Sequence, residues 1–165
     1  MRYHQIVQEN FNDPLPYTWA VRHEAQHMAT FRVGKLNYAV SFTLRDAAIG
    51  MWECQFALYK RRLFGSFKIS TGLTNTGSQF TIFATIFACI KDFIHQQHPP
   101  ILFFTAKGDS RDRLYQMLLK RFAPDLARLG YTSNSGVDPT PLADTLYVLA
   151  SSEGRRLVAQ RETLA

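Results

Sequence analysis

The spacing of the hydrophobic residues changes once along the chain, and this change strongly limits the folds open to it. From Trp19 to Ile69 apolar residues mostly alternate with polar ones, which is the pattern of half-buried β-strands. From Phe80 to Ile94 they recur every three to four residues, which is the pattern of an amphipathic helix. The sequence therefore predicts a block of strands that is followed by a long helix.

The first block divides into four expected strands. They cover residues 19–33, either unbroken or with a bulge, then 36–44, 52–58 and a shorter strand at 67–69. The connections between them are short, as at the Gly34-Lys35 turn. Short connections favour an antiparallel meander.

The second half predicts two helices that alternate with strands. The first helix ends before Pro99, and the continuous apolar run 101–104 indicates a central strand buried on both faces. A second helix begins near Asp109, is restarted or kinked at Pro124, and leads to a last strand at 146–149. We expect residues 132–143 to form a loop and the polar tail from Ser151 to be mobile.

Together these elements predict an α/β (α+β) fold with the order ββββ-α-β-α-β. Antiparallel strands that feed one right-handed crossover give a mixed, mostly antiparallel sheet with helices on its faces. The chain has 165 residues, enough to bury a substantial core. We expect residues 1–150 to be a single domain and residues 151–165 to be its polar tail.

The charge balance suits an acidic partner. Nineteen Lys and Arg residues face thirteen Asp and Glu residues, a net charge of +6. This excess fits nucleic acid, nucleotides, cofactor phosphates or an anionic surface without choosing among them.

Cys54 and Cys89 lie in apolar runs, which predicts buried free thiols and a cytoplasmic protein. We expect no signal peptide and no membrane span, because the longest apolar stretch, 80–94, is short and interrupted by polar residues.

The turn that leads into the long helix is the first candidate site. Residues 70–78 contain two glycines and several hydroxyl side chains just before a helix start. Helix N-termini bind phosphate groups through free backbone N–H groups. Thr76, Gly77 and Ser78 are therefore candidate phosphate contacts, and an ordinary capped loop is an equally open alternative.

The second candidate site follows the central strand. Ser110 and Arg111 lie on the first turn of the next helix, and Tyr115 lies one turn beyond Arg111 on the same face. Ligands in α/β sheets gather beyond the carboxyl ends of such strands. The alternative is that Ser110 caps the helix, Arg111 pairs with Asp112 and Tyr115 packs its ring.

Basic residues gather in the 60–68 hairpin and on the second helix. Basic residues interleaved with aromatic ones can bind nucleic acid, although a solvated hairpin tip is the alternative. His23 and His27 fall on one face of a strand but have no evident third ligand, so we expect no metal site. The candidate nucleic-acid contacts are Lys60, Arg61, Arg62, Lys68, Arg113, Lys120 and Arg121.

Over roughly residues 18–150 the order of elements resembles the core of the GNAT acyltransferases. The segments GSQFTIFAT (77–85) and FTAKGDSRDRLY (104–115) also look like those of small phage-encoded proteins with a GNAT-like layout. The resemblance implies that acyl-coenzyme A lies between two parallel strands that part. It also implies that the coenzyme pyrophosphate sits on the N-terminus of the long helix, and that a tyrosine on the following helix protonates the departing thiolate.

The resemblance implies a role for each candidate residue. Thr76, Gly77 and Ser78 would bind the pyrophosphate of acetyl-coenzyme A or another acyl-coenzyme A, together with Ser110 and Arg111. Tyr115 would be the catalytic acid, and Glu53 is the candidate base, with Glu24 as the other carboxylate of the meander.

The function expected from the resemblance is acyl-coenzyme A-dependent N-acyl transfer to an unknown acceptor. The alternative is a non-catalytic phage protein of the same fold that binds nucleic acid or a host macromolecule through its basic surface. A third reading is self-assembly. The sequence leaves open whether the protein is an enzyme, and for a phage protein the expected location is the host cytoplasm.

Overall fold

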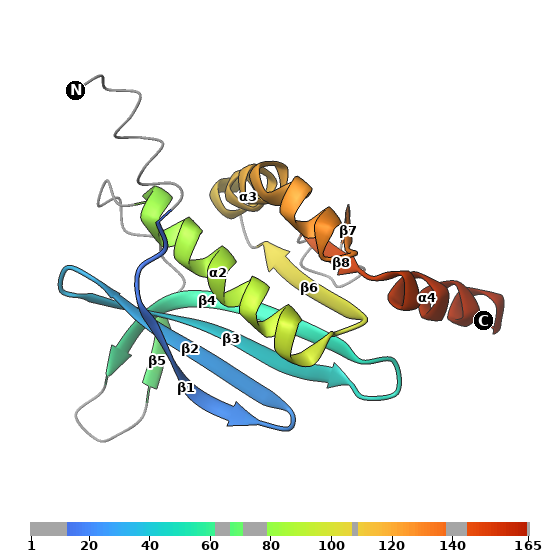
Figure 1. Cartoon of the computed structure of the whole chain (residues 1–165), viewed down its shortest axis with the longest axis horizontal. Coiled ribbons are helices and arrows are strands. Elements are labelled where there is room, and N and C mark those ends of the chain that lie inside the picture. The colour runs from blue at the N-terminus through green and yellow to red at the C-terminus, as the bar shows by residue number, and fades with distance from the viewer. Residues whose placement is uncertain (1–12, 62–66, 71–78, 107–108, 138–144, 165) are drawn as a thin grey trace. The chain divides into compact units, whose positions relative to one another are not determined.

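A computed structural model describes residues 13–61, 67–70, 79–106, 109–137 and 145–164 (Figure 1). It confirms the fold class predicted from the sequence, an α+β protein with a mixed, mostly antiparallel sheet. In chain order the elements are β1 (Tyr17–His23), β2 (Gln26–Val33), β3 (Leu36–Asp46), β4 (Met51–Arg61), β5 (Phe67–Ser70), α2 (Gln79–Gln97), β6 (Ile101–Ala106), α3 (Asp109–Arg128), β7 (Thr132–Val137), β8 (Thr145–Ala150) and α4 (Ser152–Leu164).

The strands of the sheet follow the order β1-β2-β3-β4-β6-β8-β7, and β5 pairs with β4. The pairs β1–β2, β4–β5, β6–β8 and β7–β8 are antiparallel. The β4–β6 pair is parallel and joins Met51–Glu53 to Ile101–Phe103. It is parallel because the chain returns through α2 before it enters β6, so that both strands run in the same direction.

The chain divides into two compact units. The first unit holds residues 1–42 and 55–96, and the second unit holds residues 43–54 and 97–165. Strands β3 and β4 run from one unit into the other, because the divisions fall within them.

The core of the first unit lies between α2 and the strands that it packs on (Figure 1). The rings of Phe42 in β3 and Phe93 in α2 stack in parallel with their centroids 4.0 Å apart. The His27 ring lies 5.4 Å from Phe93, and the Trp19 ring lies 6.0 Å from Phe42. Aromatic pairs add about 0.5–1.5 kcal/mol each beyond the area that they bury. The strands with alternating hydrophobic residues and the helix with its three-to-four-residue period therefore contribute side chains to one aromatic core.

The core of the second unit lies between α3 and one face of β6 and β8. The Tyr115 ring of α3 lies 5.8 Å from Phe104 in β6 and 5.7 Å from Tyr147 in β8, between ring centroids. Helix α3 also buries Leu118 and Leu126. These positions are spaced by three, eight and eleven residues, so they share one helix face.

The structure corrects the expected single strand at 19–33. This segment forms two strands, β1 and β2, which are joined by a turn at Glu24 and Ala25. A bulge, which the sequence left open, is present in β1, because the register shifts between Trp19 and Val21. The sequence does not indicate this hairpin, because apolar and polar residues continue to alternate through the turn, which contains neither glycine nor proline.

The C-terminal part of the chain also differs from the expectation. Residues 132–137 of the expected loop form β7, which pairs with β8 from Thr132 opposite Ala150 to Val137 opposite Thr145. The expected mobile tail forms helix α4. Helix α3 runs through Pro124 without a break, so the restart that the sequence allowed there does not occur.

Candidate functional site

Tyr115, the predicted catalytic acid, lies on the buried face of α3. Only 4% of its surface is exposed. Its ring is held between Phe104 and Tyr147, as described above. Packing against two aromatic side chains therefore fixes the position of the ring.

Glu53, the predicted base, lies in β4 directly opposite Phe103 of β6. Its carboxylate forms an ion pair with Arg45 of β3, in which the Nε and Nη2 atoms both lie 2.5 Å from Oε2. The Glu53 side chain is 11% exposed and the Arg45 side chain 51% exposed. Charge-assisted hydrogen bonds of this kind are among the strong ones in proteins. Arg45 therefore occupies one of the two oxygens that a general base would offer to a substrate proton.

The structure places Glu53 and Tyr115 on opposite faces of the sheet in the second unit. Successive side chains of a strand point to opposite faces, and in β6 it is Phe104 that contacts Tyr115. Glu53 is paired with Phe103, so it shares the other face. The predicted acid and the predicted base are therefore not brought together.

The other predicted coenzyme contacts fall in two places. Thr76, Gly77 and Ser78 lie outside the residues that the structure describes. Ser110 and Arg111 lie in the first turn of α3, four to five residues before Tyr115.

The predicted nucleic-acid contacts also fall on separate elements. Arg62 lies outside the described residues, and Arg113 lies in α3. Lys60 and Arg61 of β4 pair in register with Lys68 and Phe67 of β5. Lys60 is therefore at the register position opposite another lysine. Lys120 and Arg121 lie on α3 with their side chains exposed.

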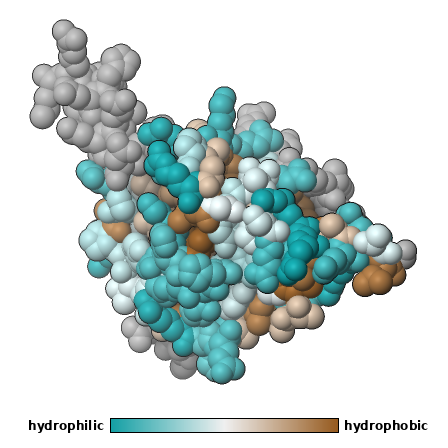
Figure 2. All heavy atoms as spheres, turned by 45° about the vertical axis from the view of Figure 1, so that its right-hand side comes forward, coloured by the Kyte–Doolittle hydropathy of each residue, from teal (hydrophilic) through white to brown (hydrophobic). Residues whose placement is uncertain are grey.

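The second unit contains a pocket of about 730 Å³ that the sequence analysis did not predict. It lies between α4 and the sheet face opposite α3, because it is lined by Phe103 rather than Phe104 and by Val148 rather than Tyr147. Figure 2 shows hydrophobic and hydrophilic atoms side by side toward the C-terminal helix. The lining residues are Ile49, Met51, Ile101, Phe103, Leu146, Val148, Ala150, Val158 and Ala159, with Thr132, Asn134, Arg155, Arg161 and Glu162 as the polar ones.

The first turn of α4 is anchored to the segment that precedes β6. The Ser151 hydroxyl accepts a hydrogen bond from the Gly154 backbone N–H (3.1 Å), which caps the helix. The Ser151 backbone N–H and hydroxyl both donate to the Pro100 carbonyl, at 3.0 and 3.3 Å. A Cβ atom at Gly154 would lie 2.0 Å from that carbonyl oxygen. Glycine is therefore required for this close approach.

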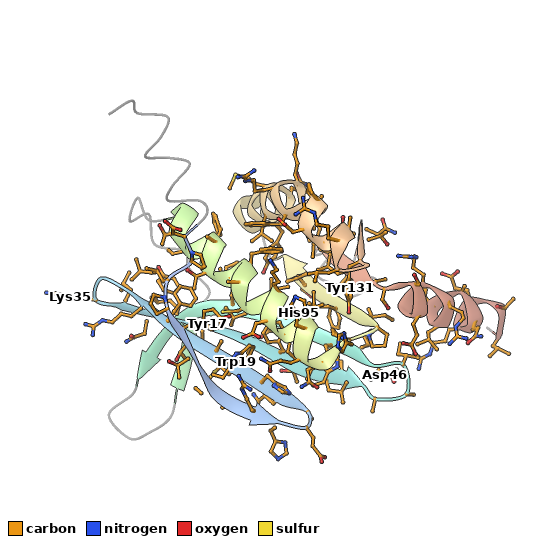
Figure 3. All side chains as sticks on the ribbon, in the orientation of Figure 1. Tyr17, Trp19, Lys35, Asp46, His95 and Tyr131 are labelled. Carbon is orange, nitrogen blue, oxygen red and sulfur yellow. The ribbon has the colours of Figure 1, made fainter. Side chains whose placement is uncertain are left out.

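An ion pair holds the other end of α4. Arg161 Nη2 lies 2.8 Å from Asp46 Oδ2, at the end of β3 (Figure 3). The hydrogen bond from Arg161 lowers the pKa of the Asp46 carboxyl below its ordinary value. Helix α4 is thus fastened at both ends, with the pocket beneath it.

Arg155 lines the pocket from the first turn of α4. Its Nη1 donates to Thr132 Oγ1 at 2.8 Å and to the Ala150 carbonyl at 3.1 Å, and its Nη2 donates to Ser152 Oγ at 3.2 Å. These three acceptors are all neutral oxygens. They hold the guanidinium in place without neutralising its charge.

The first unit contains a half-buried carboxylate that ties β1 to α2. Asp92 accepts hydrogen bonds from Trp19 Nε1 (2.8 Å), Tyr17 Oη (3.1 Å) and Gln96 Nε2 (2.8 Å). Figure 3 shows Tyr17 and Trp19 near each other on β1. Burial raises the pKa of Asp92, but these hydrogen bonds outweigh it and the net shift is downward. Burial and the Asp92 charge raise the pKa of Tyr17 to about 12. Three side-chain donors thus satisfy the two oxygens of the Asp92 carboxylate, and we assign this cluster a structural role.

Both cysteines are buried free thiols, as predicted. Burial raises the pKa of Cys89 to about 12, so the thiol is not a reactive nucleophile at neutral pH. Within the described ranges, no group of three or more His, Cys, Asp or Glu side chains is arranged to hold a metal ion. Nor does that part of the chain include a helix of the length and hydrophobicity needed to cross a membrane.

The fold and the pocket define an α+β protein with a mixed sheet and an apolar cavity on one sheet face. Residues 26–130, more than half of the chain, match the model of a family of unknown function, DUF6934, and the chain belongs to that family. The matched segment runs from β2 to the end of α3, and therefore includes Glu53 and Tyr115 but not α4. No curated protein matches the chain at a significant level.

Proposed function

We propose that the protein is an N-acyltransferase that uses acetyl-coenzyme A or another acyl-coenzyme A. The observation that supports this proposal is the order of the elements: an antiparallel meander, a parallel β4–β6 pair reached through α2, and α3 with Tyr115 before the closing strands. The resemblance to the GNAT acyltransferases rests on the order expected from the sequence, ββββ-α-β-α-β. The structure adds to this order a further strand before α2, a further strand before β8, and helix α4. No acceptor is implied beyond a primary or secondary amine.

In this reaction the acceptor nitrogen attacks the thioester carbonyl, a C–N bond forms and the C–S bond breaks. The coenzyme departs as a thiolate that needs a proton, and Tyr115 is the proposed donor. Ser110 and Arg111 lie in the first turn of the same helix, where backbone N–H groups favour phosphate. The attacking amine must lose a proton, and Glu53 lies on the other face of the sheet from Tyr115. Water, and not Glu53, is therefore the proposed acceptor of this proton.

Calorimetry with acetyl-coenzyme A tests the proposal most directly. We expect saturable binding in the micromolar range, and no heat of binding at high micromolar coenzyme would overturn the assignment. If binding is found, release of the coenzyme thiol in the presence of a panel of amines measures turnover.

A matched pair of variants then tests the proposed acid. Tyr115→Phe keeps the ring between Phe104 and Tyr147 and removes only the hydroxyl, so we expect turnover to fall about 10²- to 10⁴-fold with little change in coenzyme affinity. Tyr38→Phe, at a buried tyrosine of the first unit, is the control and should leave turnover unchanged. Equal turnover in the two variants would remove Tyr115 from the mechanism.

The proposal places the protein in the cytoplasm, where acetyl-coenzyme A is available and thiols such as Cys54 and Cys89 stay reduced. For a phage-encoded protein this would be the cytoplasm of the host.

A second candidate function is binding to an acidic macromolecule, either nucleic acid or a host protein. It is favoured by the net charge of +6 and by the register of β4 and β5, which places Lys60 opposite Lys68. Lys120 and Arg121 add exposed charge on α3. Binding to single- and double-stranded DNA should weaken steeply with salt, and Lys68→Gln should lower the salt slope by about one. If no DNA or RNA is bound even at low salt, the nucleic-acid form of this candidate is excluded.

A further inference from the structure

We propose that the pocket beneath α4 binds a free carboxylic acid with a hydrocarbon tail of medium length. The tail would occupy the apolar interior and the carboxylate would bind Arg155. The volume of about 730 Å³ falls within the range of roughly 300–1,000 Å³ that is usual for small-molecule sites.

The walls of the pocket are suited to a hydrocarbon. Met51, Phe103 and Val148 extend from three neighbouring strands and are only half-buried, and Val158 of α4 is 39% exposed. A bound hydrocarbon would remove this apolar surface from water, which stabilises the complex by about 25 cal/mol per Å².

The pocket is also held open in advance. Gly154 lies against the Pro100 carbonyl at one end of α4, and Arg161 is paired with Asp46 toward the other. The helix therefore spans the sheet face at fixed points without filling the space between them. A ligand that enters does not have to order the helix first.

Arg155 determines the charge of the ligand. Its guanidinium is held by three neutral oxygens, so the position of the charge is fixed and its neutralisation is left to a ligand. It lies in the first turn of α4, where the helix dipole is positive and an anion is favoured. One planar guanidinium matches one carboxylate.

The remaining charges of the lining determine the orientation. Arg161 is already paired with Asp46. Glu162 lies seven residues after Arg155, which places it about 10 Å further along the helix. An anion is therefore repelled from the Glu162 end and attracted to the Arg155 end, and the tail extends between them. Because this face of the sheet is opposite Tyr115, the inference is independent of the proposed acyl transfer.

The test compares octanoate with octan-1-ol on the full chain by calorimetry. We expect octanoate to bind in the micromolar range and the neutral alcohol to bind roughly tenfold to a hundredfold more weakly, because it lacks the charged contact. Arg155→Met should weaken octanoate by a similar factor and leave octan-1-ol unchanged. Arg156→Met removes the same charge from an exposed neighbour that does not line the pocket, and it should change neither affinity. Equal binding of acid and alcohol, or equal effects of the two variants, would overturn the role of Arg155.

A second pair of variants tests the location. Ala159 lines the pocket on exposed helix surface, so Ala159→Trp should fill the space and abolish octanoate binding without unfolding the protein. Gln160→Trp, one residue away and outside the lining, should bind octanoate normally. If octanoate does not bind the unmodified chain, and a concentration-dependent dimer is lost in Ala159→Trp, the pocket is a contact between two copies and the proposal is wrong.

Discussion

Two sheet faces of the molecule, each with a helix across it, differ in how they are filled. In the first unit the face under α2 is packed with stacked rings, and Phe93 has no exposed surface. In the second unit α4 is fastened at its two ends, and the face beneath it is hollow. A helix that served only stability would be expected to fill its contact, as α2 does. The pocket under α4 has the volume and the mostly apolar lining that are usual for small-molecule sites. The comparison therefore separates a structural helix from one that shapes a site.

The largest expected effect on stability comes from truncating one phenylalanine on each face, which tests this comparison directly. Phe93→Ala should lower the free energy of unfolding by about 3–5 kcal/mol, because it leaves a cavity among closely packed rings. Phe103→Ala should cost only about 1–2 kcal/mol, because its ring is half-buried and already borders open space. Urea unfolding followed by circular dichroism measures both values. Equal losses would mean that the face under α4 is packed as tightly in solution as the face under α2.

The attachment of α4 can be broken at one atom. In Gly154→Ala the new Cβ would collide with the Pro100 carbonyl oxygen, and because a backbone atom cannot move aside, the first turn of α4 has to lift away. We expect a loss of about 1–3 kcal/mol and faster amide hydrogen exchange confined to α4. Gln160→Ala, at an exposed position of the same helix, is the control. Unchanged exchange in Gly154→Ala would show that α4 is not fastened there.

Two turn glycines allow a matched comparison between the units. Gly34 and Gly50 have nearly equal positive φ angles, +59° and +63°. A Cβ atom at Gly34 meets nothing within 4 Å, whereas one at Gly50 would lie 2.7 Å from the Pro100 ring. Gly34→Ala should therefore cost about 1 kcal/mol from backbone strain, and Gly50→Ala about 1 kcal/mol more. Thermal unfolding measures the difference, and equal losses would mean that the Pro100 ring gives way freely.

The smallest effect concerns pH and the first unit. Burial, with the charges of Arg22 and His23, lowers the pKa of His27 below its ordinary value of 6.5. The unfolded chain therefore binds a proton more readily, so this contribution to stability is complete above pH 6.5 and is lost as the pH falls below it. His27→Phe should reduce the slope of stability against pH between 6.5 and 5 by at most about 1.4 kcal/mol per pH unit. An unchanged slope would mean that the pKa of His27 is the same in the folded and unfolded states, which contradicts the prediction.

The fold was predictable where the spacing of hydrophobic residues and the positions of prolines indicate the same element boundaries. Helix α2 and strands β6 and β8 were predicted nearly at their observed bounds, because their apolar residues are regular and Pro99 and Pro100 separate the first two. Strand β7 was missed because its sequence, TSNSGV, has the composition of a loop and is held in the sheet by pairing with β8. Tertiary pairing, which is not encoded in local propensity, decided that segment.

The candidate site was less predictable. Glu53 and Tyr115 were chosen for their chemical types, but the face on which each lies depends on which neighbour it pairs with in the folded sheet. The pocket is built by alternate residues of four strands and by α4, whose apolar residues Leu157, Val158 and Ala159 lie within a charged segment. A short apolar run in a polar tail was the available signal for that helix. The close approach of Gly154 to Pro100 joins residues 54 positions apart and has no local signature.

The chain has two tryptophans, and each unit contains one of them: Trp19 in the first and Trp52 in the second. Trp19 donates its indole N–H to Asp92 of α2, and Trp52 is buried in β4 within the parallel pair, opposite Leu102. Replacing either by phenylalanine leaves a single tryptophan, whose emission, excited at wavelengths that the seven tyrosines do not absorb, follows one unit alone. The molecule thus provides its own pair of optical probes, with which the unfolding of the two units can be timed separately and without an added label.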